Sequence, residues 1–415
     1  MLRLWPLAVA LGLGALVLVS KKTSPNEPAL SPLAALGHEI FHDKSLSVSG
    51  QQSCASCHLK EFGHASARGL ENGGPDMQAT GVRNTPSLRY LWRNTGFHFD
   101  EEGKASGGFF WDGRADSLNA QAAEPFLNPA EMANADKASV VAKLKRSAYA
   151  AEFARLFGTD IWQQTDKAFD AMTQALASYQ TEDPGFHPFD SVFDKVAQRR
   201  ARFSTAEERG WALFKDPEKG NCAACHTAEA GKDGSPPLFT DHSYDNLGVP
   251  RHPSLPVATR DSDYDLGLCK SKLLAAKPDN AGLCGAFKVP SLRNVAVRRA
   301  FFHNAAMTDL REVIAFYATR DTDPKRWYGK GPVFNDLPVK HRGNVNRDEV
   351  PYGQKAGEQP RLSEQDTDDL LAFLHTLTDA DLAESVAKRP GATAAANAEV
   401  RADRTAASPV ALHNR

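Results

Sequence analysis

The sequence predicts a mainly α-helical protein that consists of two tandem units of similar organisation, covered by long loops. Apolar residues recur with helical spacing along the chain, while strand-like alternation is weak throughout. Several short motifs of the first half return in the same order in the second half. Connectors rich in glycine and proline (69–110, 231–290 and 321–362) separate the helical patterns. Connectors of this length are unusual without a function, so we expect them to wrap around whatever the two units hold.

The first helix is expected directly after Ser31, because Ser31-Pro32 has the pattern of an N-cap followed by the first helical residue. The apolar residues between Leu33 and Phe41 then share one face of that helix. The stretch Ser204-Thr205-Ala206-Glu207 begins a similar helix in the second half. Further helical patterns cover 114–124, 137–157, 165–180, 309–319 and 363–377.

A five-residue motif follows each of these two opening helices. It reads Cys54-Ala55-Ser56-Cys57-His58 in the first half and Cys222-Ala223-Ala224-Cys225-His226 in the second. The segment Asn84–Arg89 is similarly echoed by Lys288–Arg293, and an amphipathic helical pattern closes each half. Three echoes in one order indicate a duplicated unit, with boundaries near 32–200 and 201–385.

Cys-x-x-Cys-His is the attachment signature of c-type haem. The two thiols can bond the two vinyl groups of one porphyrin, and the adjacent histidine can then bind the iron. Two copies in one chain therefore predict two covalent haems, attached at Cys54 and Cys57 and at Cys222 and Cys225. His58 and His226 are the expected proximal iron ligands. Each unit is accordingly predicted to be a cytochrome-c-like domain with one haem.

The bulk composition limits the partners and the compartment. A chain of 415 residues has room for two domains. Its net charge of −2, with both signs interspersed, does not indicate a nucleic acid partner. The two cysteines outside the haem motifs, Cys269 and Cys284, are expected to form a disulfide, with two free thiols as the alternative. A disulfide implies an oxidising compartment.

The two ends of the chain differ in composition from the body. Residues 1–20 carry Arg3 and then a nearly unbroken apolar run, which is either a secretory signal peptide or an uncleaved membrane anchor. A short polar linker follows, so 1–30 is expected to lie outside the folded body. Haem is attached covalently outside the bacterial cytoplasm, so the protein is predicted to be periplasmic, soluble or anchored by that apolar segment. The tail 387–415 is rich in alanine and short polar residues and is expected to be disordered.

From about residue 32 to 385 the chain resembles the bacterial dihaem cytochrome c peroxidase/MauG family. The residues that carry the resemblance are both haem motifs, Phe110-Trp111-Asp112-Gly113-Arg114-Ala115, Gln121-Ala122-Ala123, Glu131-Met132, and the run from Phe287 to Tyr317. The resemblance implies that the N-terminal haem reacts with hydrogen peroxide and that the C-terminal haem stores or relays electrons. It also implies that Trp111 lies between the two haems and takes part in the relay.

The resemblance further implies an N-terminal haem with an open or water-occupied sixth position. Members that need reductive activation have a histidine about sixteen residues after the first motif, where this chain has Gly74. His64 is the competing ligand, although a structural role for it is favoured. Gln121 and Glu131 match the distal pair of the family. A carboxylate such as Glu131 can take a proton from bound peroxide and return it to the departing oxygen, while the Gln121 amide holds the peroxide by hydrogen bonds.

For the C-terminal haem, Tyr317 stands where MauG-type members have their sixth iron ligand. Met307 is the competitor and would give a conventional His/Met site. An oxygen ligand favours oxidised iron, whereas methionine favours the reduced form. A His/Tyr haem would therefore suit the storage of an oxidising equivalent. His303 lies in the same family segment, with an expected structural role or a role toward a haem propionate.

A calcium ion between the two haems is also implied. Asn84 matches its side-chain ligand, and the backbone carbonyls at Arg298 and Ala300 match the remaining protein ligands. The family usually has threonine and proline at these last two positions, so the arginine is a departure from the pattern.

Together these observations favour a periplasmic dihaem peroxidase of the MauG-like branch, which reduces peroxide with electrons from a small cytochrome or copper protein. The alternative is the peroxide-dependent oxidation of a side chain of a partner protein. MauG uses a surface tryptophan two residues before its second haem motif for that purpose, and this chain has Gly220 there. Trp211 and Trp92 are other candidates for a tryptophan through which a partner protein could be oxidised. A rival of another class is a non-enzymatic electron-carrier cytochrome, which would have both irons six-coordinate.

Overall fold

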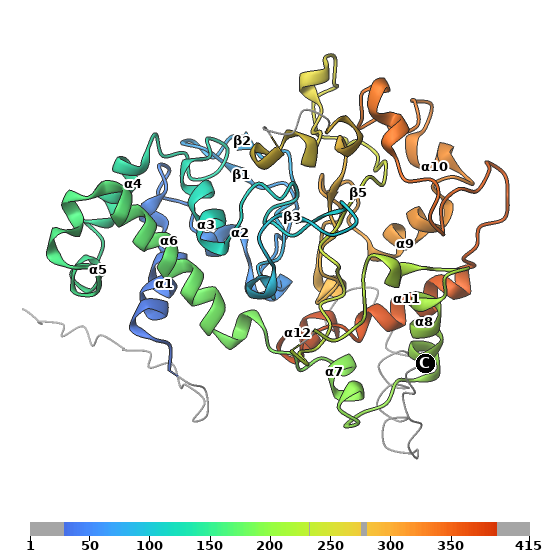
Figure 1. Cartoon of the computed structure of the whole chain (residues 1–415), viewed down its shortest axis with the longest axis horizontal. Coiled ribbons are helices and arrows are strands. Elements are labelled where there is room, and N and C mark those ends of the chain that lie inside the picture. The colour runs from blue at the N-terminus through green and yellow to red at the C-terminus, as the bar shows by residue number, and fades with distance from the viewer. Residues whose placement is uncertain (1–28, 232, 275–279, 388–415) are drawn as a thin grey trace, which may run out of the picture.

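The computed structural model of the protein describes residues 29–231, 233–274 and 280–387 (Figure 1). The predicted leader, but for its last residues, and the predicted tail from 388 lie outside the described residues. None of the helices within the described ranges is long and apolar enough to cross a membrane.

The N-terminal half is built from helices, as expected, around a core that extends from Leu36 to Phe186. Helix α1 begins where its N-cap predicts, because the Ser31 hydroxyl accepts a hydrogen bond from the Ala34 backbone N–H (3.1 Å). It packs against the long helix α6. The helices of this half are α1 (Pro32–His42), α2 (Cys54–Cys57), α3 (Leu118–Leu127), α4 (Lys137–Leu144), α5 (Ala150–Phe157) and α6 (Thr165–Glu182).

The helical pattern over 137–157 forms two helices rather than one. Helix α4 ends at Leu144 and α5 begins at Ala150. The Tyr149 hydroxyl donates to the Asp43 carboxylate (2.7 Å) and so holds the intervening turn against the end of α1. This contact joins residues that are far apart in sequence, and periodicity alone does not contain it.

The C-terminal half repeats the arrangement around a second core, which extends from Phe193 to Leu377. Here α8 packs against α11 as α1 packs against α6. A glycine lies at each crossing: a Cβ at Gly37 would collide with the Ala175 carbonyl, and one at Gly210 with the Asp369 carbonyl. The helices are α7 (Val192–Ala197), α8 (Thr205–Lys215), α9 (Leu310–Thr319), α10 (Pro324–Tyr328), α11 (Glu364–His375) and α12 (Ala380–Ala387).

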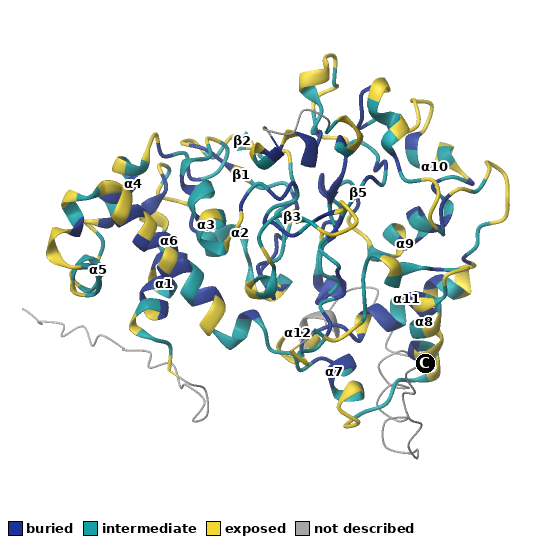
Figure 2. Cartoon of the chain, viewed as in Figure 1, coloured by how far each residue is buried: buried dark blue, intermediate teal, exposed yellow. Residues whose placement is uncertain are grey.

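Strands are few and short among the described residues, so the prediction of a mainly α fold is confirmed. Three antiparallel pairs of two-residue strands occur, each in its own small sheet. The long connectors around them mix exposed, half-buried and buried stretches, and the buried ones, in dark blue, include segments near the middle of the molecule (Figure 2). The pairs are β1 (Asn72–Gly73) with β2 (Ala79–Thr80), β3 (His98–Phe99) with β4 (Ala105–Ser106), and β5 (Tyr244–Asp245) with β6 (Phe287–Lys288).

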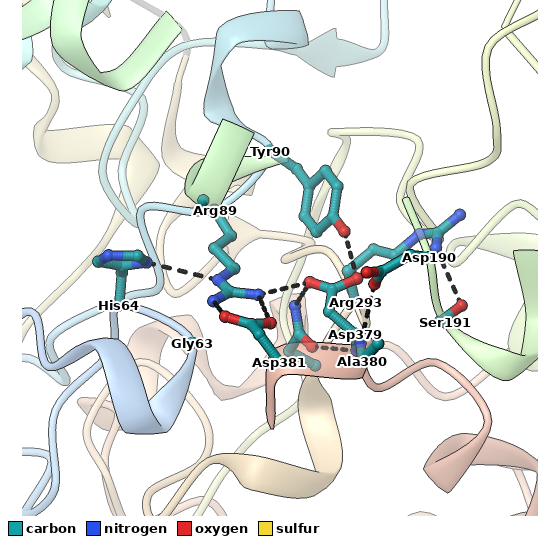
Figure 3. A network of polar contacts seen from close by, with 12 residues as sticks. Gly63, His64, Arg89, Tyr90, Asp190, Ser191, Arg293, Asp379, Ala380 and Asp381 are labelled. Carbon is teal, nitrogen blue, oxygen red and sulfur yellow. Dashed lines mark hydrogen bonds and ion pairs between the residues drawn. The ribbon is translucent and has the colours of Figure 1, made fainter. Parts of the chain in front are cut away.

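A buried polar network, which we call the seam network, joins the two halves (Figure 3). The Arg89 guanidinium donates to the carboxylates of Asp379 (2.7 Å) and Asp381 (2.6 Å). The Tyr90 hydroxyl and the Asn294 amide also donate to Asp379. Asp379 is fully buried, with an exposed fraction of 0 %. Contacts between residues about 290 positions apart therefore fix how the halves sit against each other.

Candidate functional site

The first haem motif forms the short helix α2 and presents two free thiols and one imidazole. Cys54 and Cys57 are unpaired cysteines, and His58 follows as the C-cap. The His58 Nδ1 lies 3.1 Å from the His64 backbone oxygen. A carbonyl oxygen only accepts hydrogen bonds, so Nδ1 carries the proton and Nε2 keeps its lone pair. Burial lowers the pKa of His58 to about 4, so its ring is neutral at pH 7.

The second motif repeats this chemistry in a 3₁₀ turn over Cys222–Ala224. Cys222 and Cys225 are likewise unpaired. The His226 Nδ1 donates to the Phe239 backbone oxygen (2.9 Å), and burial lowers the pKa of the ring. In both motifs a backbone carbonyl orients the ring and leaves Nε2 free, as is usual for histidines that bind metals. The donor sets therefore fit two haems.

A cavity runs beside the second motif and reaches the N-terminal half. Its lining is mostly apolar and includes Val289, Leu292 and Phe301. Residues predicted to be functional line it from both halves: Asn84, Trp111, Gln121, His226 and Tyr317. The fold therefore brings together, around one space, side chains that the sequence placed up to about 230 residues apart.

Trp111 is held from both sides of the seam. Its indole Nε1 donates to the Asn84 backbone oxygen (2.8 Å) in the N-terminal half. Its own backbone oxygen accepts from the Lys288 backbone N–H (2.8 Å) in the C-terminal half. The residue also lines the cavity.

Glu131 lies beside the first motif. The Asn128 side-chain amide donates to its carboxylate (2.6 Å), and burial raises its pKa. Burial first, and then the charge of nearby carboxylates including Glu131, raises the pKa values of the Cys54 and Cys57 thiols to about 12. Glu131 is thus a poorly hydrated carboxyl group close to the predicted haem, which suits a group that exchanges protons.

The loop around Gly74, where members of the family that need reductive activation have a histidine, packs against the segment that contains Glu131. The Gly74 backbone N–H donates to the Glu131 carbonyl (2.8 Å). Gly74 has a φ of +83°, and a Cβ there would lie 3.1 Å from the Ala79 Cβ and 3.2 Å from the Pro129 carbonyl oxygen. A larger side chain would therefore be strained at this position.

His64 is buried. Its ring stacks on Phe186 with a centroid separation of 4.3 Å, and its Nδ1 accepts from the Arg89 Nε (3.4 Å). Burial and the Arg89 charge lower its pKa to about 3. Its backbone oxygen orients His58, so its contribution to the site is through the main chain.

The two candidates for the sixth ligand of the second haem lie in different surroundings. Tyr317, on α9, lines the cavity that His226 also lines. Met307 is buried, with an exposed fraction of 4 %, and packs in the core of the C-terminal half. Its backbone pairs with that of Phe301. Met307 is not one of the described residues that line this cavity.

The groups implied for calcium converge only in part. The Asn84 side-chain amide donates to the carbonyls of Ala300 (3.1 Å) and Phe302 (3.0 Å). The Arg298 side chain turns back along its own loop and donates to the Ser291 and Arg293 carbonyls (2.8 Å each). A carbonyl pair therefore faces the end of the Asn84 side chain, and a cation there would require the amide to present its oxygen.

The remaining predicted residues have the following surroundings. Cys269 and Cys284 form a disulfide, with a Cα–Cα distance of 4.8 Å. The His303 ring stacks on Phe287 (3.5 Å between centroids) and lines the cavity. Trp92 is partly exposed (39 %), and Trp211 is half-buried against Phe373.

Sequence reasoning missed Tyr352. Its ring lies near Tyr317 (6.0 Å between centroids, 24° between planes), with the Arg320 guanidinium 3.7 Å above the centroid. It is buried and lines the cavity, and its hydroxyl has no hydrogen-bond partner. The residue belongs to the connector 321–362, where no periodicity or motif singles it out.

Fold and site together define a class: a mainly α protein of two similar halves, each with a haem-attachment motif, that share one cavity. Residues 31–202 match the family model described as di-haem cytochrome c peroxidase. The chain belongs to the dihaem cytochrome c peroxidase/MauG family. The methylamine utilization protein MauG of Paracoccus denitrificans is 38 % identical over 365 residues, which cover 85 % of this chain and 90 % of that protein.

Two further relatives support the same assignment. The cytochrome-c peroxidase IdrP1 of Denitromonas iodatirespirans is 30 % identical over 70 % of this chain and 74 % of that protein. The crystal structure of the diheme peroxidase BthA from Burkholderia thailandensis superposes with a TM-score of 0.81 at 37 % identity, over 88 % of this chain and 89 % of that one. As a member of this family, the protein is an oxidoreductase with two haem cofactors.

Proposed function

We propose that the protein is a periplasmic peroxidase that reduces hydrogen peroxide to water at an N-terminal haem, with electrons relayed through a C-terminal haem. The haems are attached covalently at Cys54 and Cys57 and at Cys222 and Cys225. The observation that carries the proposal is the unequal surroundings of the motifs. Glu131, half-buried and with a raised pKa, lies beside the first motif, whereas a phenol, Tyr317, lines the cavity beside the second.

The two units are proposed to be cytochrome-c-like domains with boundaries near 32–200 and 201–385. Two separate hydrophobic cores support this division, because one extends from Leu36 to Phe186 and the other from Phe193 to Leu377. The equivalent crossings of α1 with α6 and of α8 with α11 support it as well.

Haem bound at His58 would supply the site that binds peroxide and accepts electrons. The reaction consumes H2O2, two electrons and two protons and yields two water molecules, so a group must move protons between the peroxide oxygens. Glu131 takes the proton from the oxygen that stays and delivers it to the oxygen that leaves. Its raised pKa supports both directions of transfer. Gln121, a neutral amide on α3, orients the peroxide without competing for its proton.

Trp111 connects the two centres. The indole N–H donates to the Asn84 backbone oxygen, and the Trp111 backbone oxygen accepts from the Lys288 backbone N–H, so contacts from both halves hold the residue in place. Tyr317 would supply an oxygen ligand to the iron of the second haem, and such a ligand would favour the oxidised state. The core packing of Met307 supports this choice over a His/Met site.

A calcium ion at the seam is part of the proposal. A half-turn of the Asn84 amide would direct its oxygen at the point that its nitrogen now occupies between the Ala300 and Phe302 carbonyls. Oxygen donors of this kind are the ligands that calcium prefers.

An EPR spectrum of the resting ferric protein tests the central claim. We expect one high-spin signal from an open N-terminal haem and one low-spin signal from the His/Tyr haem, together with peroxide turnover. Two low-spin signals without turnover, before or after reduction, would instead identify an electron-carrier cytochrome.

A second candidate function is the peroxide-dependent oxidation of a partner protein's side chain, which the similarity to a methylamine utilization protein MauG favours. Gly220 in place of an exit tryptophan favours a small cytochrome or copper protein as electron donor instead. Stopped-flow mixing of the peroxide-treated protein with reduced cytochrome c, and mass spectrometry of candidate partner proteins, separate the two. Fast cytochrome oxidation supports the first, and a modified partner residue supports the second.

A further inference from the structure

Two positively charged side chains line the cavity without an acidic partner. Arg298 and Lys288 both belong to the segment that runs from β6 to α9, and both are half-buried. No described carboxylate lies within 4 Å of either charge. The other buried arginines differ: Arg89 pairs with Asp379 and Arg293 with Asp194.

The partners that these two cations do have are neutral. Arg298 donates through one terminal nitrogen to two backbone carbonyls (2.8 Å each), while its Nε is buried without a partner. The Lys288 Nζ donates to the Gly108 carbonyl (2.6 Å). Asp112 is the acid that acts on Lys288 from a distance, and its carboxylate already binds Arg83 (2.7 Å) and Arg114 (2.8 Å).

The acids of the cavity are engaged elsewhere. Asp336 binds Arg251 (2.8 Å). Asp245 and Glu349 both accept from the Asn346 amide (3.0 Å each). None of the described carboxylates that line the cavity therefore forms an ion pair with Arg298 or Lys288.

Such an arrangement is unfavourable unless an anion completes it, because a charge removed from water needs a counter-charge. Burial lowers the pKa of Arg298 to about 10 and that of Lys288 to about 7, which shows how poorly water reaches them. Arg298 and Lys288 line the same cavity as Cys222, Cys225 and His226 of the second motif. The missing anions therefore belong to whatever His226 holds.

A porphyrin of the c type carries two propionate carboxylates, one for each of these cations. We propose that Arg298 and Lys288 neutralise the propionates of the haem attached at Cys222 and Cys225 and thereby raise its reduction potential. This inference rests on the proposed attachment of that haem. Arg298 binds one carboxylate through its free Nε and its remaining N–H groups, as a guanidinium does. Lys288 binds the other as a point charge.

The holoprotein variant Arg298→Gln tests the proposal, with Arg299→Gln as its matched control. Arg299 is the next residue and carries the same charge, but its side chain is exposed and lies 5.8 Å from the Phe62 ring. Spectroelectrochemical titration of the low-spin haem should show a lower midpoint potential in Arg298→Gln and an unchanged one in Arg299→Gln. Lys288→Gln should lower the same potential.

Two further measurements separate this role from a merely structural one. Arg298→Lys keeps the charge and should restore most of the potential. The resonance Raman propionate bending modes should shift in Arg298→Gln and stay at their wild-type frequencies in Arg299→Gln. Unchanged potentials and Raman modes in both Arg298→Gln and Lys288→Gln would overturn the inference, as would equal shifts in the Arg299 control.

The mass of the purified protein shows whether a negative result contradicts the inference or the proposed function. If mass spectrometry shows two covalent haems, and Arg298→Gln and Lys288→Gln have the potentials and Raman modes of the wild type, the inference alone is refuted. A protein that lacks haem at the second motif would refute the proposed function first and the inference with it.

Discussion

Removal of the Asp379 carboxylate should destabilise the protein far more than removal of Asp381, although both bind the same guanidinium. Asp379 is fully buried and accepts from Arg89, Tyr90 and Asn294. The side chain of Asp381 is 34 % exposed and accepts from Arg89 alone among the donors of the seam network. The variants Asp379→Ala and Asp381→Ala therefore compare a buried and a solvated partner of one arginine.

The magnitudes follow from these contacts. Breaking a buried ion pair costs about 3–5 kcal/mol, and Arg89 keeps Asp381, which places this part near the lower end. The Tyr90 hydroxyl and the Asn294 amide each lose a buried acceptor, at about 1 kcal/mol or more apiece. We therefore expect Asp379→Ala to lower the free energy of unfolding by about 5 kcal/mol, less any relaxation of the site. A partly solvated pair such as Arg89 with Asp381 is worth about 1 kcal/mol or less.

Urea denaturation of the two holoprotein variants, followed by far-UV circular dichroism, measures the difference. The network joins the two halves, so Asp379→Ala should also separate the unfolding of the halves and broaden the transition. An Asp379→Ala midpoint equal to that of Asp381→Ala would refute the reasoning, because burial would then make no difference to the value of the pair.

Three further predictions concern the chemistry. Glu131→Gln should lower kcat/KM for peroxide by about 10²–10⁴-fold. The control Glu152→Gln should not, because the Glu152 side chain is 43 % exposed and lies on α5. Because burial raises the pKa of Glu131, the rate of the wild-type protein should rise with pH around a value above the ordinary glutamate pKa. This rise of the rate with pH should be absent in Glu131→Gln. If the variant shows the same rise, another group is the base. Tyr317→Phe should perturb only the low-spin EPR signal, and the same effect from Met307→Ala would make methionine the ligand. Trp111→Phe should slow electron transfer between the haems, as followed by stopped-flow spectra. The lost hydrogen bond should lower the free energy of unfolding by about 0.5–1.5 kcal/mol. A transfer rate equal to that of the wild type would exclude Trp111 as the relay.

Local patterns in the sequence determined the haem motifs and most of the helices. The spacing of two thiols and an imidazole within one turn is complete in five residues, and an N-cap such as Ser31 needs only the next few residues. Both are readable without knowledge of the fold. The roles of Glu131 and Tyr317 came from a family resemblance, and they stay predictions until the experiments above are made.

The tertiary structure alone decided which distant side chains meet. Arg89 and Arg293 stand at equivalent places of the repeated motif, yet the first binds Asp379 and the second Asp194. Arg298 reads in the sequence as any other arginine, and only the packing of the halves shows that it lines a cavity without an acid beside it. Charge and residue type are local properties. Burial and pairing depend on the packing of both halves, so they emerge only when the chain is folded.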